Sequence, residues 1–196
     1  WFHTDLGLQG IYRSEDGGES WNRVCPVDVI MDHNSATPNE QNRYTQHRFC
    51  WDPTTENGPE TARRWYCVVN REVSPRHDPK AGGNLDGKLL RSDDGGRTWT
   101  TVSSLDLETY GRHDMLRHHP SASGVLFLGC EKGFFRSADG GRTFTRNDSL
   151  PVGRVRTIEI NPADPGDIHA TIDDKGLYRT HDGGREIGRA SCRERV

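Results

Sequence analysis

The stretch "RSDDGGRTWT" (residues 91–100) decides the fold, because the chain contains four versions of it. The other three are "RSEDGGESWN" (13–22), "RSADGGRTFT" (136–145) and "RTHDGGREIG" (179–188). Their first hydroxyl residues are Ser14, Ser92, Ser137 and Thr180, so successive copies begin 78, 45 and 43 residues apart. A period in the 40s is typical of repeat proteins that build one four-stranded unit per repeat.

The segments between the copies read as short strands separated by turns. The last repeat predicts strands over 155–162, 168–172 and 177–180, and the repeat before it over 113–120, 125–130, 134–137 and 142–147. The 78-residue interval hides a further repeat, with strands over 47–53, 63–70, 88–92 and 97–102, and the first repeat is only half present. Pro53, Pro120 and Pro162 end the first strand of these three units, where a missing N–H does no harm.

Each repeated stretch therefore spans the hairpin between the third and fourth strands of a unit. Its aspartate can accept hydrogen bonds from amides of the turn, and its glycine pair supplies the positive φ angles of a tight hairpin. The aromatic residue that follows is expected to bury its ring against a neighbouring sheet. The hairpin residues are Ser14, Asp16, Gly18, Trp21, Ser92, Asp94, Gly96, Thr98, Trp99, Ser137, Asp139, Gly141, Thr143, Phe144, Thr180, Asp182 and Gly184.

A calcium-binding loop is the alternative interpretation of "SDDGG" (92–96). Such a loop requires a later acidic ligand, which these stretches lack. The sequence therefore predicts no metal site and no cofactor, and we interpret the hairpins as structural.

The hairpin residues match the Asp-box, S-x-D-x-G-x-T-W, which is also called the BNR repeat. The second copy fits it fully, whereas Ser20 replaces Thr in the first, Phe144 replaces Trp in the third and Thr180 replaces Ser in the fourth. The resemblance covers nearly all of residues 1–185. It implies a β-propeller, as in sialidases, xyloglucanase-type glycoside hydrolases, sortilin-like receptors and photosystem assembly factors.

The resemblance makes the expected fold an all-β propeller of about four four-stranded blades, the first and last incomplete. The blades are expected at about 1–24, 45–102, 112–147 and 153–185, with the remaining blades of the ring missing from this chain. The tail "EIGRASCRERV" (186–196) resembles the translation of a common sequencing adapter and replaces the Thr-Trp of the repeat. We expect it to lie outside the fold.

Composition excludes several classes of protein. The 196 residues carry a formal net charge of −3 without a clustered basic segment, so no nucleic-acid partner is expected. No apolar run approaches the roughly 18 residues of a membrane span. The five cysteines form no C-x-x-C pair, which argues against a zinc ribbon. Cys50 and Cys67 fall in neighbouring predicted strands, and their spacing leaves open whether they form a disulfide.

Strand direction predicts where ligands would bind. In a four-stranded meander the 1–2 and 3–4 connections leave one face, and the 2–3 and 4–1 connections leave the other. The long connections 25–46 and 71–87 therefore emerge on the face opposite the Gly-rich hairpins. Long loops on a rigid scaffold commonly carry binding residues, and the families resembled bind substrate on that face.

Several polar residues belong to this face. Arg112 and Arg154 share one position at the start of the first strand, and His47, Asp114 and Arg156 share the next. An arginine fork suits a carboxylate or phosphate, and the alternative is salt bridges between blades. The segments "PRHDP" (75–79) and "GRHD" (111–114) each place a His beside an Asp, an arrangement suited to acid–base chemistry. The ligand-binding candidates are His47, Arg76, His77, Asp78, Arg112, His113, Arg154 and Arg156.

One catalytic candidate comes from the resemblance. In xyloglucanase-type hydrolases, T-D-x-G-G-x-Y-R before an Asp-box carries a catalytic carboxylate. Here "HTDLGLQGIYRS" (3–14) resembles it, with two extra residues, and identifies Asp5. Glycoside hydrolysis needs two carboxylates, and in that family the second lies in another propeller domain.

Aromatic and histidine residues complete the inventory. Trp51, Trp65 and Tyr66 belong to predicted strands and are either core residues or a sugar-stacking platform. His118 and His119 are read as strand residues that point to opposite faces and so cannot share one metal ion.

Two functions follow, and the sequence leaves open whether the protein is an enzyme. The first is a carbohydrate-active propeller resembling glycoside hydrolases, which favours an extracytoplasmic or secreted location. The sialidase-type Arg-Ile-Pro motif is not found in this sequence. The second is a non-catalytic propeller that acts as a protein-interaction scaffold, like the sortilin or photosystem-assembly relatives.

Overall fold

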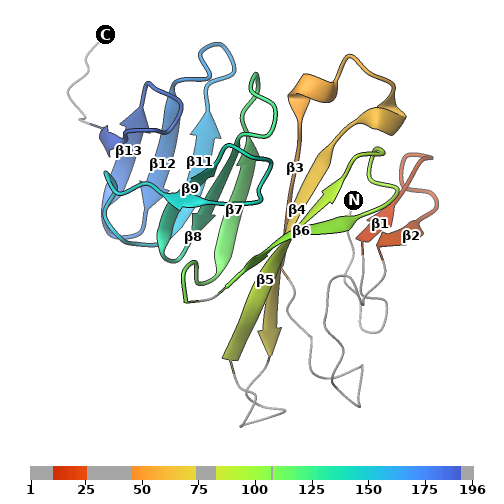
Figure 1. The fold of residues 1–196 in the computed structure, drawn as a ribbon, viewed down its shortest axis with the longest axis horizontal. Coiled ribbons are helices and arrows are strands. Elements are labelled where there is room, and N and C mark those ends of the chain that lie inside the picture. The colour runs from red at the N-terminus through yellow and green to blue at the C-terminus, as the bar shows by residue number, and fades with distance from the viewer. Residues whose placement is uncertain (1–10, 26–45, 74–82, 107, 191–196) are drawn as a thin grey trace. The chain divides into compact units, whose positions relative to one another are not determined.

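The computed structural model describes residues 11–25, 46–73, 83–106 and 108–190. These residues form four antiparallel sheets, one of two strands and three of four strands (Figure 1). The chain divides into two compact units, residues 1–51 with 55–107 and residues 52–54 with 108–196. A search of the described residues finds no helix that is long and apolar enough to cross a membrane.

The first unit contains the two-stranded sheet and one four-stranded sheet. The two-stranded sheet pairs β1 (Ile11–Arg13) with β2 (Asn22–Cys25). The four-stranded sheet has the order β3 (Gln46–Trp51), β4 (Trp65–Val73), β5 (Gly83–Ser92) and β6 (Thr100–Leu105). Two short 3-10 helices, η1 (Pro53–Thr55) and η2 (Glu60–Ala62), lie in the connection from β3 to β4.

The second unit contains two four-stranded sheets that lie side by side (Figure 1). One has the order β7 (His113–His118), β8 (Leu126–Cys130), β9 (Gly133–Ser137) and β10 (Thr145–Arg146). The other has the order β11 (Val155–Ile160), β12 (Ile168–Ile172), β13 (Gly176–Thr180) and β14 (Gly188–Arg189). Each sheet follows chain order, as the sequence predicts.

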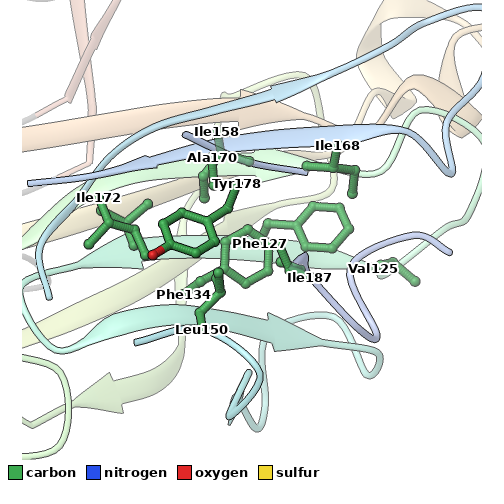
Figure 2. Close-up of a cluster of buried hydrophobic side chains, with 11 residues drawn as sticks. Val125, Phe127, Phe134, Leu150, Ile158, Ile168, Ala170, Ile172, Tyr178 and Ile187 are labelled. Atoms are coloured by element: carbon green, nitrogen blue, oxygen red, sulfur yellow. The ribbon is translucent and has the colours of Figure 1, made fainter. Parts of the chain in front are cut away.

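The core of the second unit lies between these two sheets. Phe127 and Phe134 come from the β7–β10 sheet, and Ile158, Ala170 and Tyr178 come from the β11–β14 sheet (Figure 2). All five side chains are buried. Burying a large apolar side chain stabilises a fold by about 1.5–3 kcal/mol, so this contact is a principal source of stability for the unit.

The Gly-rich hairpins have the hydrogen bonds that the sequence predicts. Asp94 Oδ1 accepts from the Thr98 amide at 2.9 Å, and Asp94 Oδ2 accepts from the Thr98 hydroxyl at 2.6 Å. Equivalent amide bonds join Ser20 to Asp16, Thr143 to Asp139 and Glu186 to Asp182, at 2.9, 3.0 and 3.1 Å. Both glycines of every hairpin have positive φ. The carboxylates therefore hold their own turns.

The apolar position of the hairpins is buried to different degrees. Trp99 is 9% exposed and packs with Ile11 and other core residues of the first unit. Phe144 is half-buried, whereas Trp21 is 43% exposed. The prediction that all three rings are buried is therefore wrong for Trp21, because no described sheet lies before β1 to cover it.

The prediction that the tail lies outside the fold is wrong for residues 187–189. Ile187 occupies the position of Trp99 in its hairpin and is 3% exposed in the core of the second unit. Gly188 and Arg189 pair with Arg179 and Tyr178 as strand β14. Ile187 and the backbone of residues 188–189 thus take the places that Trp99 and the start of β6 have in the second repeat.

Two further expectations concern His119 and the cysteines. His118 ends β7, but His119 lies in the following turn, where its Nδ1 accepts the Ser121 amide at 3.2 Å. Asp52 and Asn161, which also precede a proline, accept the equivalent amides at 3.0 Å. Cys50 and Cys67 form no disulfide. The register pairs Cys67 with Phe49, so the two cysteines leave opposite faces of the sheet.

Candidate functional site

The sequence places the candidate site at the edge where the 2–3 and 4–1 connections lie. In the second unit this edge, here called the loop edge, consists of residues 108–112, 131–132, 147–154 and 173–175. Asp5, Arg76, His77 and Asp78 lie outside the described residues. His47 lies in β3, where it pairs with Val69.

Arg154 is held by an aspartate of the neighbouring sheet. Its Nε donates to Asp114 Oδ2 at 2.5 Å and its Nη2 donates to Asp114 Oδ1 at 2.7 Å. Asp114 is 8% exposed, so the pair is largely shielded from water. The hydrogen bonds to Asp114 raise the pKa of Arg154 above its ordinary value. For Arg154 the sequence left two alternatives, an anionic ligand or a salt bridge between blades, and the structure contains the salt bridge.

Arg156 is paired within its own sheet. Its Nε lies 2.9 and 2.8 Å from the two carboxylate oxygens of Asp173 in the 2–3 connection. Hydrogen bonds from Arg156 lower the pKa of Asp173. Asp114 and Arg156 are both the extra residue of a β-bulge, one in β7 and one in β11. Bulges change the direction of a side chain, and both bulged residues form ion pairs, Asp114 with Arg154 and Arg156 with Asp173.

Arg112 and His113 have different surroundings. The Arg112 amide donates to Glu131 Oε2 at 3.1 Å, which ties the start of β7 to the β8–β9 turn. His113 is 1% exposed, and its ring centroid lies 5.9 Å from that of Tyr110. The His113 side chain is therefore buried and is not exposed to solvent at the loop edge.

The aromatic candidates in the first unit belong mainly to its core. Tyr66 is fully buried, and Trp65 packs at the margin of the same apolar cluster as Trp99. The Arg63 guanidinium lies over the Trp51 ring, 5.9 Å from its centroid, which is a cation–π contact.

Two hollows lie at the opposite edge, where the Gly-rich hairpins and the 1–2 connections are found. This hairpin edge was interpreted from sequence as structural only. In the first unit a cavity of about 340 Å³ is lined by aromatic residues that include Phe49, Trp65 and Trp99, together with Arg13 and Arg63. In the second unit a more polar groove of about 460 Å³ contains three arginines, Arg136, Arg146 and Arg185.

The sequence contains a signal for these hollows that the analysis of motifs missed. An arginine directly precedes the first hydroxyl residue of every hairpin, at Arg13, Arg91, Arg136 and Arg179. Two of these four line a hollow. Within the described ranges no group of three His, Cys, Asp or Glu side chains gathers as a metal site would require.

Comparisons with known proteins agree with the fold. No protein-family model matches the chain. A curated xyloglucanase from a Paenibacillus species is 32% identical over 117 residues, which are 55% of this chain and 11% of that protein. The GH74 enzyme of Niastella koreensis superposes with a TM-score of 0.63 at 19% identity, over 96% of this chain and 27% of that one. The GH74 xyloglucanase of Xanthomonas campestris gives 0.61 at 20% identity, over 98% and 28%.

These likenesses and the repeated four-stranded meanders define the class of the protein. The chain is a stretch of about four blades of a β-propeller. The chain is similar to part of a xyloglucanase, and it spans about a tenth of that curated relative and about a quarter of the solved ones.

Proposed function

We propose that this chain is part of a carbohydrate-active propeller that binds a polysaccharide of the xyloglucan class. The observation that carries the proposal is the 32% identity over 117 residues with the Paenibacillus xyloglucanase. The fold likeness to the two GH74 enzymes supports it. Because the chain spans 11% of the curated relative, polysaccharide binding is the property to test before hydrolysis. An extracytoplasmic or secreted location follows from such a substrate.

The loop edge is the proposed binding surface. The structure supports this choice, because Arg154 and Asp173 of the loop edge form ion pairs with Asp114 and Arg156, which lie at the adjoining ends of β7 and β11. Arg156 is the more exposed of the two arginines, with 51% of its side chain accessible, and is the better placed to hydrogen-bond sugar hydroxyls. Asp5 is proposed as one carboxylate of a hydrolytic pair, whose separation would set retention or inversion.

Affinity gel electrophoresis with xyloglucan tests the proposal, with an unbranched cellulose derivative as the comparison polysaccharide. The 196-residue chain should be retarded by xyloglucan, and Arg156→Gln should weaken binding by about fivefold, as expected for the loss of one hydrogen bond. Arg142→Gln is the matched control, because Arg142 is an exposed arginine at the hairpin edge. Equal migration with and without xyloglucan would exclude the proposal.

A non-catalytic scaffold is the second candidate. It is favoured by the pairing of Arg154 with Asp114 and of Arg156 with Asp173, because these charges are used within the protein. A loop edge of balanced charge suits the polar rim of a protein–protein interface. A chain that binds no glycan, and whose affinity for a protein partner falls in Arg156→Gln, would favour this candidate over the first.

A further inference from the structure

The arginine before each Gly-rich hairpin has a carboxylate partner in three of the four repeats. Arg13 forms an ion pair with Glu15, and its Nη2 lies 3.5 Å from Glu60 Oε1. Arg91 Nη2 lies 2.8 Å from Asp93 Oδ2, and Arg179 Nε lies 2.7 Å from Asp167 Oδ1. The repeat thus provides two positions for the partner, either two residues after the arginine or at the start of the second strand.

Arg136 is the exception among the described residues. Ala138 stands where the first two repeats have Glu15 and Asp93. The register places Val125 where the fourth repeat has Asp167. Arg136 therefore has no ion pair with any described carboxylate, and its buried Nε has no hydrogen-bond acceptor.

A second arginine faces the same space. Arg136 and Arg185 both line the groove of about 460 Å³ at the hairpin edge of the second unit. Asn147 fixes the backbone there, because its Nδ2 donates to the carbonyls of Gly184 and Arg185 at 3.0 and 3.1 Å. The third arginine of the groove, Arg146, is paired with the exposed Asp148 at 2.6 Å.

The nearby carboxylates, Asp139 and Asp182, accept hydrogen bonds from residues of their own turns. Asp139 accepts from Ser137 and from the amide and hydroxyl of Thr143. Asp182 accepts from the Thr180 hydroxyl and from the amides of Arg185 and Glu186. Burial and the charge of Arg185 lower the pKa of Arg136, while Asp182 acts in the opposite sense. The positive charge of Arg136 is thus only partly compensated.

We propose that Arg136 and Arg185 form an oxyanion-binding site in this groove. Two planar guanidinium groups can hold a carboxylate, sulfate or phosphate group by paired N–H···O hydrogen bonds, as Arg91 holds Asp93 in its own repeat. The bound group would supply the acceptor that Ala138 and Val125 do not. Of the residues that line the groove only Asn147 belongs to the loop edge, and none of the four ion-pair residues of the proposed polysaccharide surface lines it.

Isothermal titration of the 196-residue chain with sodium sulfate, at constant ionic strength, tests the site. Arg136→Gln should weaken sulfate binding by about tenfold or more, as expected for hydrogen bonds to a charged group. Arg91→Gln is the matched control and should leave sulfate binding unchanged, because Arg91 is already paired with Asp93.

Ala138→Asp is the second variant and removes the site without removing an arginine. It restores the sequence "RSDDGG" of the second repeat, so the new carboxylate should pair with Arg136 and exclude sulfate. This variant should bind sulfate about tenfold more weakly and should unfold at a higher temperature. Wild-type protein that does not bind sulfate, or that binds it no more tightly than these two variants, would overturn the proposal.

Two further titrations distinguish an acidic glycan from a free inorganic ion as the natural ligand. An oligogalacturonide that binds more tightly than sulfate would assign the group to an acidic glycan, and one that binds equally or less tightly would assign a free inorganic ion. An uncharged xyloglucan oligosaccharide should bind Arg136→Gln as it binds the wild type. If neither the wild type nor any variant binds the neutral oligosaccharide, the proposed function is contradicted and the sulfate result stands independently of it. If only Arg136→Gln loses neutral binding, the groove is not separate from the polysaccharide surface and the present proposal is contradicted.

Discussion

At Asp94, one carboxylate accepts hydrogen bonds from two amides and two hydroxyls of its own hairpin. Burial alone would raise the pKa of Asp94, but the hydrogen bonds from Thr98, Ser92 and the Arg97 amide outweigh it and lower the pKa to about 2. The same balance lowers the pKa of Asp139 to about 2. The ionised carboxylate is therefore the form that stabilises the folded chain.

We expect the protein to lose stability in acid for this reason. The folded-state pKa of about 2 lies below the unfolded value of about 3.9, so the stabilisation is fully present above about pH 4 and is lost as the pH falls toward 2. Urea unfolding followed by circular dichroism across this range measures it. Asp94→Asn should cost about 1–2 kcal/mol at neutral pH and should flatten the pH dependence. An unfolding free energy that stays constant down to pH 2 would contradict this account.

At the scale of the element, the hairpins of the three four-stranded sheets are each joined to the 1–2 connection of their own sheet. The Gly95 amide donates to the Arg63 carbonyl at 2.9 Å, and Gly140 and Gly183 make the same bond to Gly124 and Gly166. The approach is close: a Cβ on Gly95 would lie 2.5 Å from the Glu60 carbonyl oxygen. In the first repeat Gly17 has a similar φ, but no atom of the described residues lies within 4 Å of the equivalent position.

This difference makes Gly17 a matched control for Gly95. Gly17→Ala should cost about 1 kcal/mol, because only the positive φ opposes the new side chain. Gly95→Ala should cost more than about 2 kcal/mol, because the backbone of η2 must also move. Thermal unfolding of both variants gives the comparison, and equal melting temperatures would show that the contact with η2 does not constrain the hairpin.

At the scale of the whole molecule, the fold was predictable because the residues that form each hairpin are close together in the sequence. The aspartate, the hydroxyls and the glycine pair lie within a few residues of one another, so the hairpins and the strand order were correct from sequence. Burial of Trp21 and Ile187 was not predictable, since it depends on which sheet lies alongside. The ion pairs of Arg154 and Arg156 likewise depend on β-bulges and on partners elsewhere in the chain, Asp114 in β7 and Asp173 in a 2–3 connection.

The end of the described chain provides a test at this scale. A chain that stops at residue 185 loses Ile187 and strand β14, which are part of the second unit. We expect it to be about 2 kcal/mol less stable than a chain that stops at residue 190, from the burial of one isoleucine. Urea unfolding compares the two. Identical midpoints would mean that Ile187 contributes nothing to the core.

The bond from hairpin amide to the carbonyl of the same blade has an evolutionary consequence. Because the hairpin of each four-stranded blade bonds to that same blade, a duplicated or deleted blade keeps this hydrogen bond. Unequal recombination can therefore change the number of blades without compensating mutations in these turns. The positions around the repeated arginine, such as Ala138 and Val125, are free to diverge, so that Arg136 can acquire a separate role.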